Sequence, residues 1–312
     1  MIDVATFGET MGTIRFTDIP ALGGTPRASF AGAESNVAIG LVRLGHKAAW
    51  VGTVGHDTFG SLIQRGLRAE QVDVTGARMT DEHSTGLLVS RDAGLGSFAV
   101  DYHRSNSAAR QITKEQIEHI FALNPTYVHL TGITPALGSK AYEATMYLAR
   151  EARQRGIALT FDVNYRSRLW SPEEAAPVLT EIARNATIVF GGPEEIQMLT
   201  GCEDIDEGVA QLLDYGVEEV VYKSAGAATS VTRDTTVSEP GMKVPVRDTI
   251  GAGDAFVAGF LSGKLDGKTS SECLKRGHIC GAFAVGNIGD WEGAPSRESL
   301  IALELGAGEV LR

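Results

Sequence analysis

Cysteine is scarce in this chain, with three residues among 312 and none in a Cys-x-x-Cys or Cys/His pattern. Zinc sites and redox motifs need such spacing, so neither is indicated. The odd number and scatter favour a reducing compartment with free, mostly buried thiols. Cys273 and Cys280 are seven apart in a predicted helix, and two helical turns are too long a distance for a disulfide.

Long apolar runs and positive charge are also lacking. No stretch approaches the roughly 18 consecutive apolar residues of a membrane-spanning helix, and the N-terminus lacks the pattern of a secretory signal. There are 28 Lys and Arg residues against 39 Asp and Glu, a net charge of −11. No overall basic field would attract nucleic acid or an anionic membrane. We therefore expect a cytoplasmic protein with no nucleic-acid or membrane partner.

Two familiar nucleotide motifs are missing as well. The sequence has no G-x-x-x-x-G-K-[ST], which excludes a Walker-type kinase. It has no G-x-G-x-x-G between an early strand and a helix, which argues against a dinucleotide-binding fold.

Strand-like and helix-like segments alternate along most of the chain. The apolar patterns predict strands at residues 2–7, 48–54, 127–130, 158–163, 188–190 and 218–222. They predict helices at residues 36–44, 60–68, 139–155, 172–185 and 193–199. This alternation is typical of an α/β fold with a mostly parallel sheet and helices on both faces. A fold of that class can contain all of residues 1–312 in one domain.

Two segments interrupt this alternation. Residues 12–30 and 84–102 alternate apolar and polar side chains, with glycine and proline between them. We expect them to form one small β-sheet that projects from the main body. A sheet of that size buries little by itself, so it should serve as a lid, as a homo-oligomer contact, or as both.

The segment that carries most chemical information is Asp-Thr-Ile-Gly-Ala-Gly-Asp, which begins at Asp248 and ends at Asp254. An apolar helix follows it, and a helix N-terminus presents unpaired N–H groups that suit a phosphate. A carboxylate placed there can accept the proton of an attacking hydroxyl. The alternative is an ordinary glycine turn whose aspartate only caps a helix.

Two separate signatures resemble the ribokinase-like family of carbohydrate kinases. The first is Gly-Ala-Glu-Ser-Asn-Val-Ala from Gly32, with Arg-Leu-Gly from Arg43 and Gly-Thr-Val-Gly-His-Asp-Thr-Phe-Gly from Gly52. The second is the segment that ends at Asp254. The resemblance covers nearly the whole chain. It implies a ribokinase-like three-layer sandwich with a β-sheet lid, and ATP-dependent phosphorylation of a sugar.

Further segments resemble the branch of that family that phosphorylates 2-keto-3-deoxygluconate, a sugar acid. They lie at residues 102–109, 129–133, 162–170 and 289–293. Arg104 and Arg166 fit this branch, because each could clamp a carboxylate with paired N–H donors. For either arginine the alternative is a solvated surface cation. A kinase for another sugar, such as fructose or a deoxy-keto inositol derivative, and a non-catalytic binding protein remain open.

The resemblance also implies roles for individual residues. Asp254 is expected to be the general base, and the backbone N–H groups of Gly251, Ala252 and Gly253 should hold the transferring phosphoryl group. The sugar acid is expected to contact Gly32, Asn36, Tyr102, Arg104, Ile133, Arg166, Asp248 and Asp290. ATP is expected to contact Asn164, Lys223, Ser224, Gly226, Thr249, Gly251, Gly253 and His278. Mg²⁺ is expected to be held largely through water, with Glu195 as a partner.

The chain departs from the family pattern at a few positions. Gly192 stands where an asparagine usually precedes Glu195, Leu88 stands where a tyrosine is frequent, and His278 stands where an asparagine near adenine is common. In the ATP turn, Ala225 and Ala228 replace two glycines. Because alanine tolerates positive φ poorly, we expect this turn to follow a different path.

Overall fold

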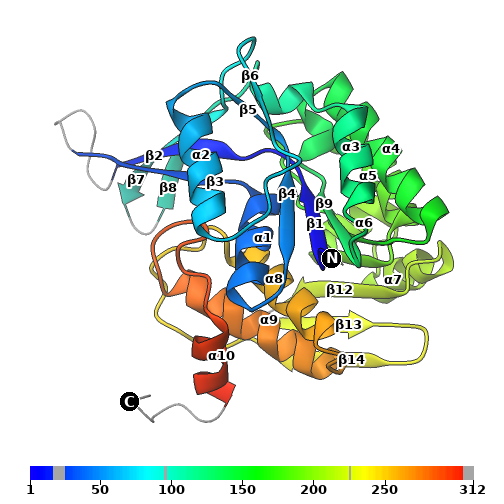
Figure 1. Cartoon of the computed structure of the whole chain (residues 1–312). Coiled ribbons are helices and arrows are strands. Elements are labelled where there is room, and N and C mark those ends of the chain that lie inside the picture. The colour runs from blue at the N-terminus through cyan, green and yellow to red at the C-terminus, as the bar shows by residue number, and fades with distance from the viewer. Residues whose placement is uncertain (17–24, 95–96, 225, 305–312) are drawn as a thin grey trace.

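An eight-stranded sheet forms the centre of the protein in the computed structural model, which describes residues 1–16, 25–94, 97–224 and 226–304 (Figure 1). The strand order is β14-β13-β12-β11-β10-β9-β1-β4, parallel from β4 to β12 and antiparallel from β12 to β14. The strands are β1 (Val4–Phe7), β4 (Ala48–Val51), β9 (Tyr127–Thr131), β10 (Ala158–Asp162), β11 (Ile188–Gly191), β12 (Glu219–Ser224), β13 (Ala227–Val231) and β14 (Thr236–Pro240).

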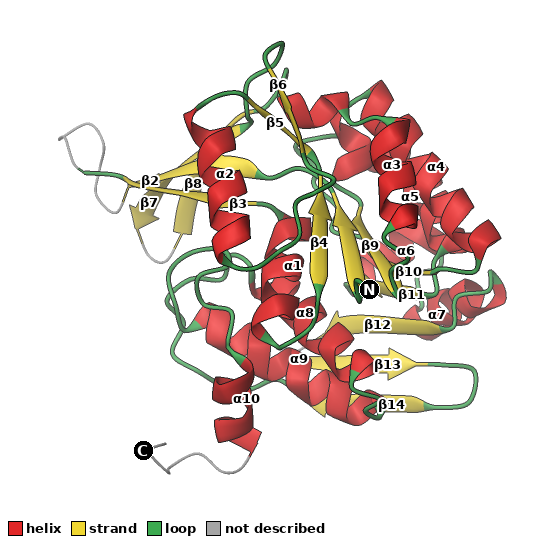
Figure 2. Ribbon diagram, in the orientation of Figure 1, coloured by secondary structure: helices red, strands yellow, loops and turns green. Residues whose placement is uncertain are grey.

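Helices cover both faces of this sheet, which gives three layers (Figure 2). One face packs against α3 (Lys114–Ala122), α4 (Ser139–Arg155), α5 (Pro172–Asn185), α6 (Pro193–Thr200) and α7 (Ile205–Asp214). The other packs against α1 (Ala33–Arg43), α2 (Thr58–Ala69), α8 (Ala252–Leu265) and α9 (Ser270–Val285), and α10 (Arg297–Glu304) follows α9. The predicted α/β class is confirmed. Within the described residues, we found no helix with the length and apolar character needed to cross a membrane.

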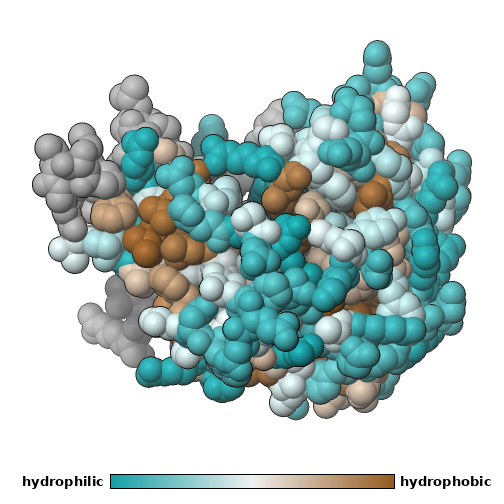
Figure 3. All heavy atoms as spheres, turned by 90° about the horizontal axis from the view of Figure 1, so that it is seen from above, coloured by the Kyte–Doolittle hydropathy of each residue, from teal (hydrophilic) through white to brown (hydrophobic). Residues whose placement is uncertain are grey.

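A second sheet of four strands projects from the main body, in the order β3-β2-β7-β8. Its strands are β2 (Met11–Phe16), β3 (Arg27–Ala31), β7 (Leu87–Gly94) and β8 (Ser97–His103). The two segments predicted for a small sheet therefore pair with each other, although their residues 17–24 and 95–96 lie outside the described part. In Figure 3, apolar side chains gather on the lid side of a face that is otherwise mainly hydrophilic.

The structure differs from the predicted pattern at Gly52. The predicted strand at residues 48–54 is two strands, because the chain leaves the central sheet after β4 and pairs again in the short sheet of β5 (Thr53–Gly55) and β6 (Arg78–Thr80). Gly52 lies at the change of direction, where an added Cβ would come within 2.6 Å of the Gly8 carbonyl oxygen. The β13–β14 hairpin was not predicted. It lies at one edge of the sheet, where β14 alternates exposed and half-buried residues.

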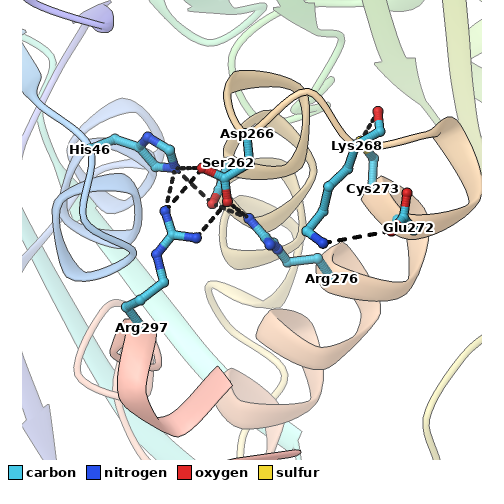
Figure 4. A network of polar contacts seen from close by, with 8 residues as sticks. All are labelled: His46, Ser262, Asp266, Lys268, Glu272, Cys273, Arg276 and Arg297. Atoms are coloured by element: carbon cyan, nitrogen blue, oxygen red, sulfur yellow. Dashed lines mark hydrogen bonds and ion pairs between the residues drawn. The ribbon is translucent and has the colours of Figure 1, made fainter. Parts of the chain in front are cut away.

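A network of charges joins the C-terminal helix to the main body (Figure 4). Asp266 accepts hydrogen bonds from Arg276 of α9 at 2.5 Å and from Arg297 of α10 at 2.5 Å. His46 lies 3.8 Å from Asp266, and Ser262 contacts both His46 and Arg276. The two guanidinium groups hold the pKa of Asp266 well below its usual range, although burial opposes them.

Removal of the Asp266 charge should therefore destabilise the fold. We expect Asp266→Asn to lower the free energy of unfolding by about 1–3 kcal/mol, less than for a fully buried pair because the side chain is partly exposed. Since the folded pKa lies below the unfolded one, this difference should be complete above about pH 5 and shrink as the pH falls through about 4. Urea unfolding over a pH series measures it.

The matched control is the Asp214–Arg233 pair, 3.6 Å apart with side chains 77% and 63% exposed. Asp214→Asn should change the free energy of unfolding by less than about 0.5 kcal/mol. Equal effects of the two substitutions would contradict a stabilising role for the Asp266 network.

Candidate active site

A cavity of about 1450 Å³ lies between the four-stranded sheet and the carboxyl ends of the central parallel strands. Alternate residues of β2 and β7 face it, namely Met11, Thr13, Arg15, Leu88 and Ser90. The other side is formed by the start of α1, the segment after β10, the turn before α8 and residues 288–292. Ligands bind at this end of open α/β sheets, and the small sheet covers the cavity as a lid.

The glycine-rich turn ends in a helix start, as the sequence predicted, but α8 begins earlier than expected. Its first residue is Ala252, and Gly251 precedes it with φ +75°, a left-handed conformation suited to glycine. A Cβ at Gly251 would also collide with the carbonyl oxygen of Asp290. The first N–H groups of a helix have no partner within it, so those that follow Gly251 can bind an anion.

Asp254 lies in the first turn of α8 and lines the cavity. Asn36 donates a hydrogen bond from Nδ2 to Asp254 Oδ2 at 2.8 Å. Burial raises the pKa of Asp254 to about 6, while the Asn36 hydrogen bond and the positive charges of Arg166 and Lys223 act in the opposite direction. A carboxylate with a pKa near neutrality can accept a proton from a hydroxyl group and release it again.

Three more cavity carboxyl groups have raised pKa values. Burial raises the pKa of Glu34 to about 7, of Asp162 to about 7 and of Asp290 to about 8. Glu195 and Asp254 raise the pKa of Asp162 further, whereas Lys223 and Arg166 lower it. Several perturbed acids in one cavity are typical of a functional site. Of these groups, Glu34 and Asp162 were not predicted as site residues from the sequence, although Asp162 lies near the end of the predicted strand at residues 158–163 and is the last residue of β10, at the ligand-binding end of the sheet.

Arg104 is held beside a buried glutamate that the sequence analysis also missed. Arg104 Nη2 lies 2.5 Å from Glu9 Oε2, and Ser107 donates a hydrogen bond to Glu9 Oε1 at 2.6 Å. Nη2 is therefore paired with the Glu9 carboxylate, whereas Nε of Arg104 is buried without a hydrogen-bond acceptor. These two nitrogens form the edge of the guanidinium that can grip a carboxylate.

Arg166 also reaches the cavity, from the segment after β10. Arg166 Nη1 donates a long hydrogen bond, 3.5 Å, to the backbone carbonyl of Tyr165. Asn164 nearby has φ +41°, a conformation rare for a residue other than glycine. Backbone strain of this kind is concentrated at binding sites.

Most of the predicted site residues line this one cavity. The structure brings together Gly32, Asn36, Tyr102, Arg104, Ile133, Asn164, Arg166, Glu195, Lys223, Thr249, Gly251, Gly253, Asp254 and Asp290. Five predicted residues are not among those that line it: Ser224, Gly226, Asp248, Ala252 and His278.

The surroundings explain two of these five. The Asp248 side chain is fully buried, paired with Arg15 and bonded to backbone N–H groups. His278 contacts the carbonyl of Glu239 through Nε2 at 3.0 Å and packs edge-on against Phe256.

The predicted ATP turn is the connection of the hairpin between β12 and β13, and its different path from that of the family stays a prediction. Gly226 has φ +78° and supplies the left-handed residue, and Ala228 is buried within β13. Ala225 lies outside the described residues.

Glu195 lies three residues after Gly192, the position at which the family usually has an asparagine. Its carboxylate accepts hydrogen bonds from the backbone N–H of Gly192 at 2.7 Å and of Tyr165 at 2.8 Å. Glu195 therefore caps the start of α6, although position 192 has no asparagine side chain. Among the described residues there is no group of three or more His, Cys, Asp or Glu side chains that could hold a metal ion directly.

An anion-binding helix start next to a buried carboxylate, inside a cavity large enough for two ligands, indicates a small-molecule kinase. The model for pfkB family carbohydrate kinases matches residues 1–297, and the chain belongs to that family.

Individual relatives cover nearly the full length. The chain is 37% identical over 307 residues to 2-dehydro-3-deoxygluconokinase of Bacillus subtilis, which covers 96% of this chain and 94% of that protein. It is 31% identical to the PfkB protein from Polaromonas sp. JS666, with a TM-score of 0.87, covering 97% of this chain and 100% of that one. A putative ribokinase II of Escherichia coli in complex with ATP and Mg²⁺ has a TM-score of 0.90 at 21% identity, covering 98% and 99% of the two chains, a likeness of fold.

The Asp254 carboxyl should titrate close to neutral pH in the free protein. We expect an apparent pKa of about 6. Carboxyl ¹³C NMR measures it, and Asp254→Asn identifies its signal among the other cavity acids. Asn36→Ala should raise the pKa further, because the Asn36 hydrogen bond stabilises the charged form. A value near 4 in the wild type would contradict the burial argument.

Proposed function

We propose that this protein catalyses the ATP-dependent phosphorylation of 2-keto-3-deoxygluconate, or a close sugar acid, at its terminal hydroxyl. The observation that carries the proposal is Arg104, whose buried Nε has no hydrogen-bond acceptor and which lines the cavity that also contains Asp254. The Bacillus subtilis relative with this activity by name supports the same substrate.

The Arg104 donors favour an acid over a neutral sugar. Glu9 pairs with Nη2, but the buried Nε donor has no acceptor, which is costly, and a substrate carboxylate can accept a hydrogen bond from it. The rest of the cavity is rich in acidic groups, including Glu34, Asp162 and Asp290. An anionic substrate therefore needs a local cation, and Arg104 and Arg166 supply two.

Phosphoryl transfer then follows from the positions of Asp254 and the turn before it. The terminal hydroxyl of the sugar acid gives its proton to the Asp254 carboxylate while its oxygen attacks the γ-phosphorus in line with the leaving oxygen of ADP. One P–O bond forms and the bond to ADP breaks. The N–H groups at the start of α8 face the negative charge of the transferring group.

ATP is proposed to lie beside Asn164, Lys223 and Thr249, which share the cavity with the sugar acid. The residues present fit a magnesium ion held through water. The carboxylate oxygens of Glu195 keep lone pairs beyond their backbone hydrogen bonds, and Asp162 lines the cavity beside it. When bound, the ion would neutralise phosphate charge.

The alternatives make different demands on the same groups. A kinase for fructose or a deoxy-keto inositol derivative would leave Nε of Arg104 without a charged acceptor. A non-catalytic binding protein would have no use for a buried acid at a helix start, and Asp254 is such an acid.

A substrate panel with coupled ADP detection tests the proposal. We expect turnover of 2-keto-3-deoxygluconate and little with fructose or ribose. Arg104→Met should raise the KM for the sugar acid by about a hundredfold, since a charge-assisted pair contributes a few kcal/mol. Asp254→Asn, the matched test of the base, should lower kcat by about 10²–10⁴ while binding is kept.

Three outcomes would contradict it. Fructose or ribose turned over in place of the acid would reject the substrate. An unchanged KM in Arg104→Met would reject the carboxylate clamp, and a near-wild-type rate in Asp254→Asn would remove Asp254 from the mechanism.

A homo-oligomer through the lid sheet is a further part of the proposal. The edge strands β3 and β8 carry exposed residues, and apolar side chains gather on the lid side in Figure 3. Light scattering should give a mass of at least twice the 33.1 kDa of one chain. A single-chain mass would end this prediction.

A further inference from the structure

Asp248 joins three separate segments, although its carboxylate does not line the cavity. Arg15 of lid strand β2 forms an ion pair with Oδ2. Ile250 N–H donates to Oδ1 at 3.1 Å, and Gly289 N–H donates to Oδ2 at 3.3 Å. The Asp248 side chain is completely buried and that of Arg15 is 13% exposed, so water screens this charge pair little.

The position of Asp248 determines the path of the phosphate-binding turn. Its bond to Ile250 closes a tight turn two residues on, just before Gly251 begins α8. Gly251 in turn packs against the Asp290 carbonyl without room for a Cβ. A shift of the Asp248 carboxylate would therefore move the N–H groups that follow Gly251.

The lid also contacts the segment on the far side of this turn. Trp291 Nε1 donates to the Phe30 carbonyl at 3.0 Å, and the two rings stack with centroids 4.9 Å apart. Ser29 donates to Glu292 at 2.9 Å. These contacts attach β3 to residues 291–292, whereas Arg15 attaches β2 to the turn itself.

We propose that Arg15 is a positioning residue that aligns the phosphate-binding turn when the lid strand β2 covers the cavity. This inference rests on the proposed kinase function. Arg15 supplies the counter-charge that the buried Asp248 carboxylate needs, and an unpaired carboxylate there would be costly. Asp248 therefore keeps its place, and the turn its path, while Arg15 is in contact. The N–H groups of the turn are thus in position for phosphoryl transfer when the lid encloses the substrates.

A double-mutant cycle on kcat tests this role, with Arg15→Met, Asp248→Asn and both together. The asparagine keeps an acceptor for Ile250 and removes the charge. We expect each single variant to lower kcat by about tenfold or more, because small displacements of catalytic groups are costly. The double variant should be no slower than the slower single one. KM for both substrates should stay within about threefold.

The matched control is Arg27 of β3, whose side chain is 63% exposed and lies 3.6 Å from Glu292. Arg27→Met removes a lid cation that does not reach the turn, and kcat should stay within about twofold. Arg15→Lys keeps the charge and should retain more activity than Arg15→Met. If Arg15→Met does not fold, Arg15→Lys with Asp248→Asn completes the cycle.

Different outcomes reject different claims. Losses in kcat that multiply in the double variant would show that the two residues act independently and would overturn the inference. A raised KM for the sugar acid with kcat kept would make Arg15 a substrate ligand instead. A wild-type protein without turnover on any sugar would reject the proposed function itself, whereas an active wild type with a multiplicative cycle would reject the role of Arg15 alone.

Discussion

The close packing of Gly251 against the Asp290 carbonyl is the contact on which the candidate active site depends. It allows α8 to begin at Ala252, beside the cavity, and so places Asp254 in the first helical turn. A side chain at position 251 would separate the turn from residues 288–292 and move the helix start. The positions of the N–H groups at the helix start, of Asp254 and of Asp290 thus all depend on the absence of a side chain at position 251.

Burial then gives the carboxyl groups around that contact their properties. Asp254, Asp162, Glu34 and Asp290 all have raised pKa values because the cavity withholds water from their charged forms. Arg166 and Lys223 counteract this for Asp254 and Asp162. These carboxyl groups therefore gain and lose protons near neutral pH. Each further negative charge in the cavity needs a nearby cation, and the buried Arg104 is one such cation.

Much of the fold was predictable because its signals are local. The helix at Ser139–Arg155 and the one at Pro172–Asn185 agree with the predicted bounds, since Gly156 ends the first and Pro172 starts the second. The turn to Asp254 was equally visible. The partners of Arg15 and Ser107 were not, because Asp248 lies 233 residues from Arg15 and Glu9 lies 98 from Ser107. No local pattern marks such pairs, and the sequence alone did not show that the Asp248 carboxylate pairs with the lid strand.

The cavity of about 1450 Å³ exceeds the roughly 300–1,000 Å³ that usually encloses one drug-sized ligand. Arg104 and Lys223 both line this one continuous space. A single molecule that carries a carboxylate at one end and an adenosine group at the other, joined by phosphates, would therefore occupy the whole cavity. Such a molecule would be a selective inhibitor of this enzyme. Such a tethered molecule gains affinity from the high effective concentration of each end once the other is bound.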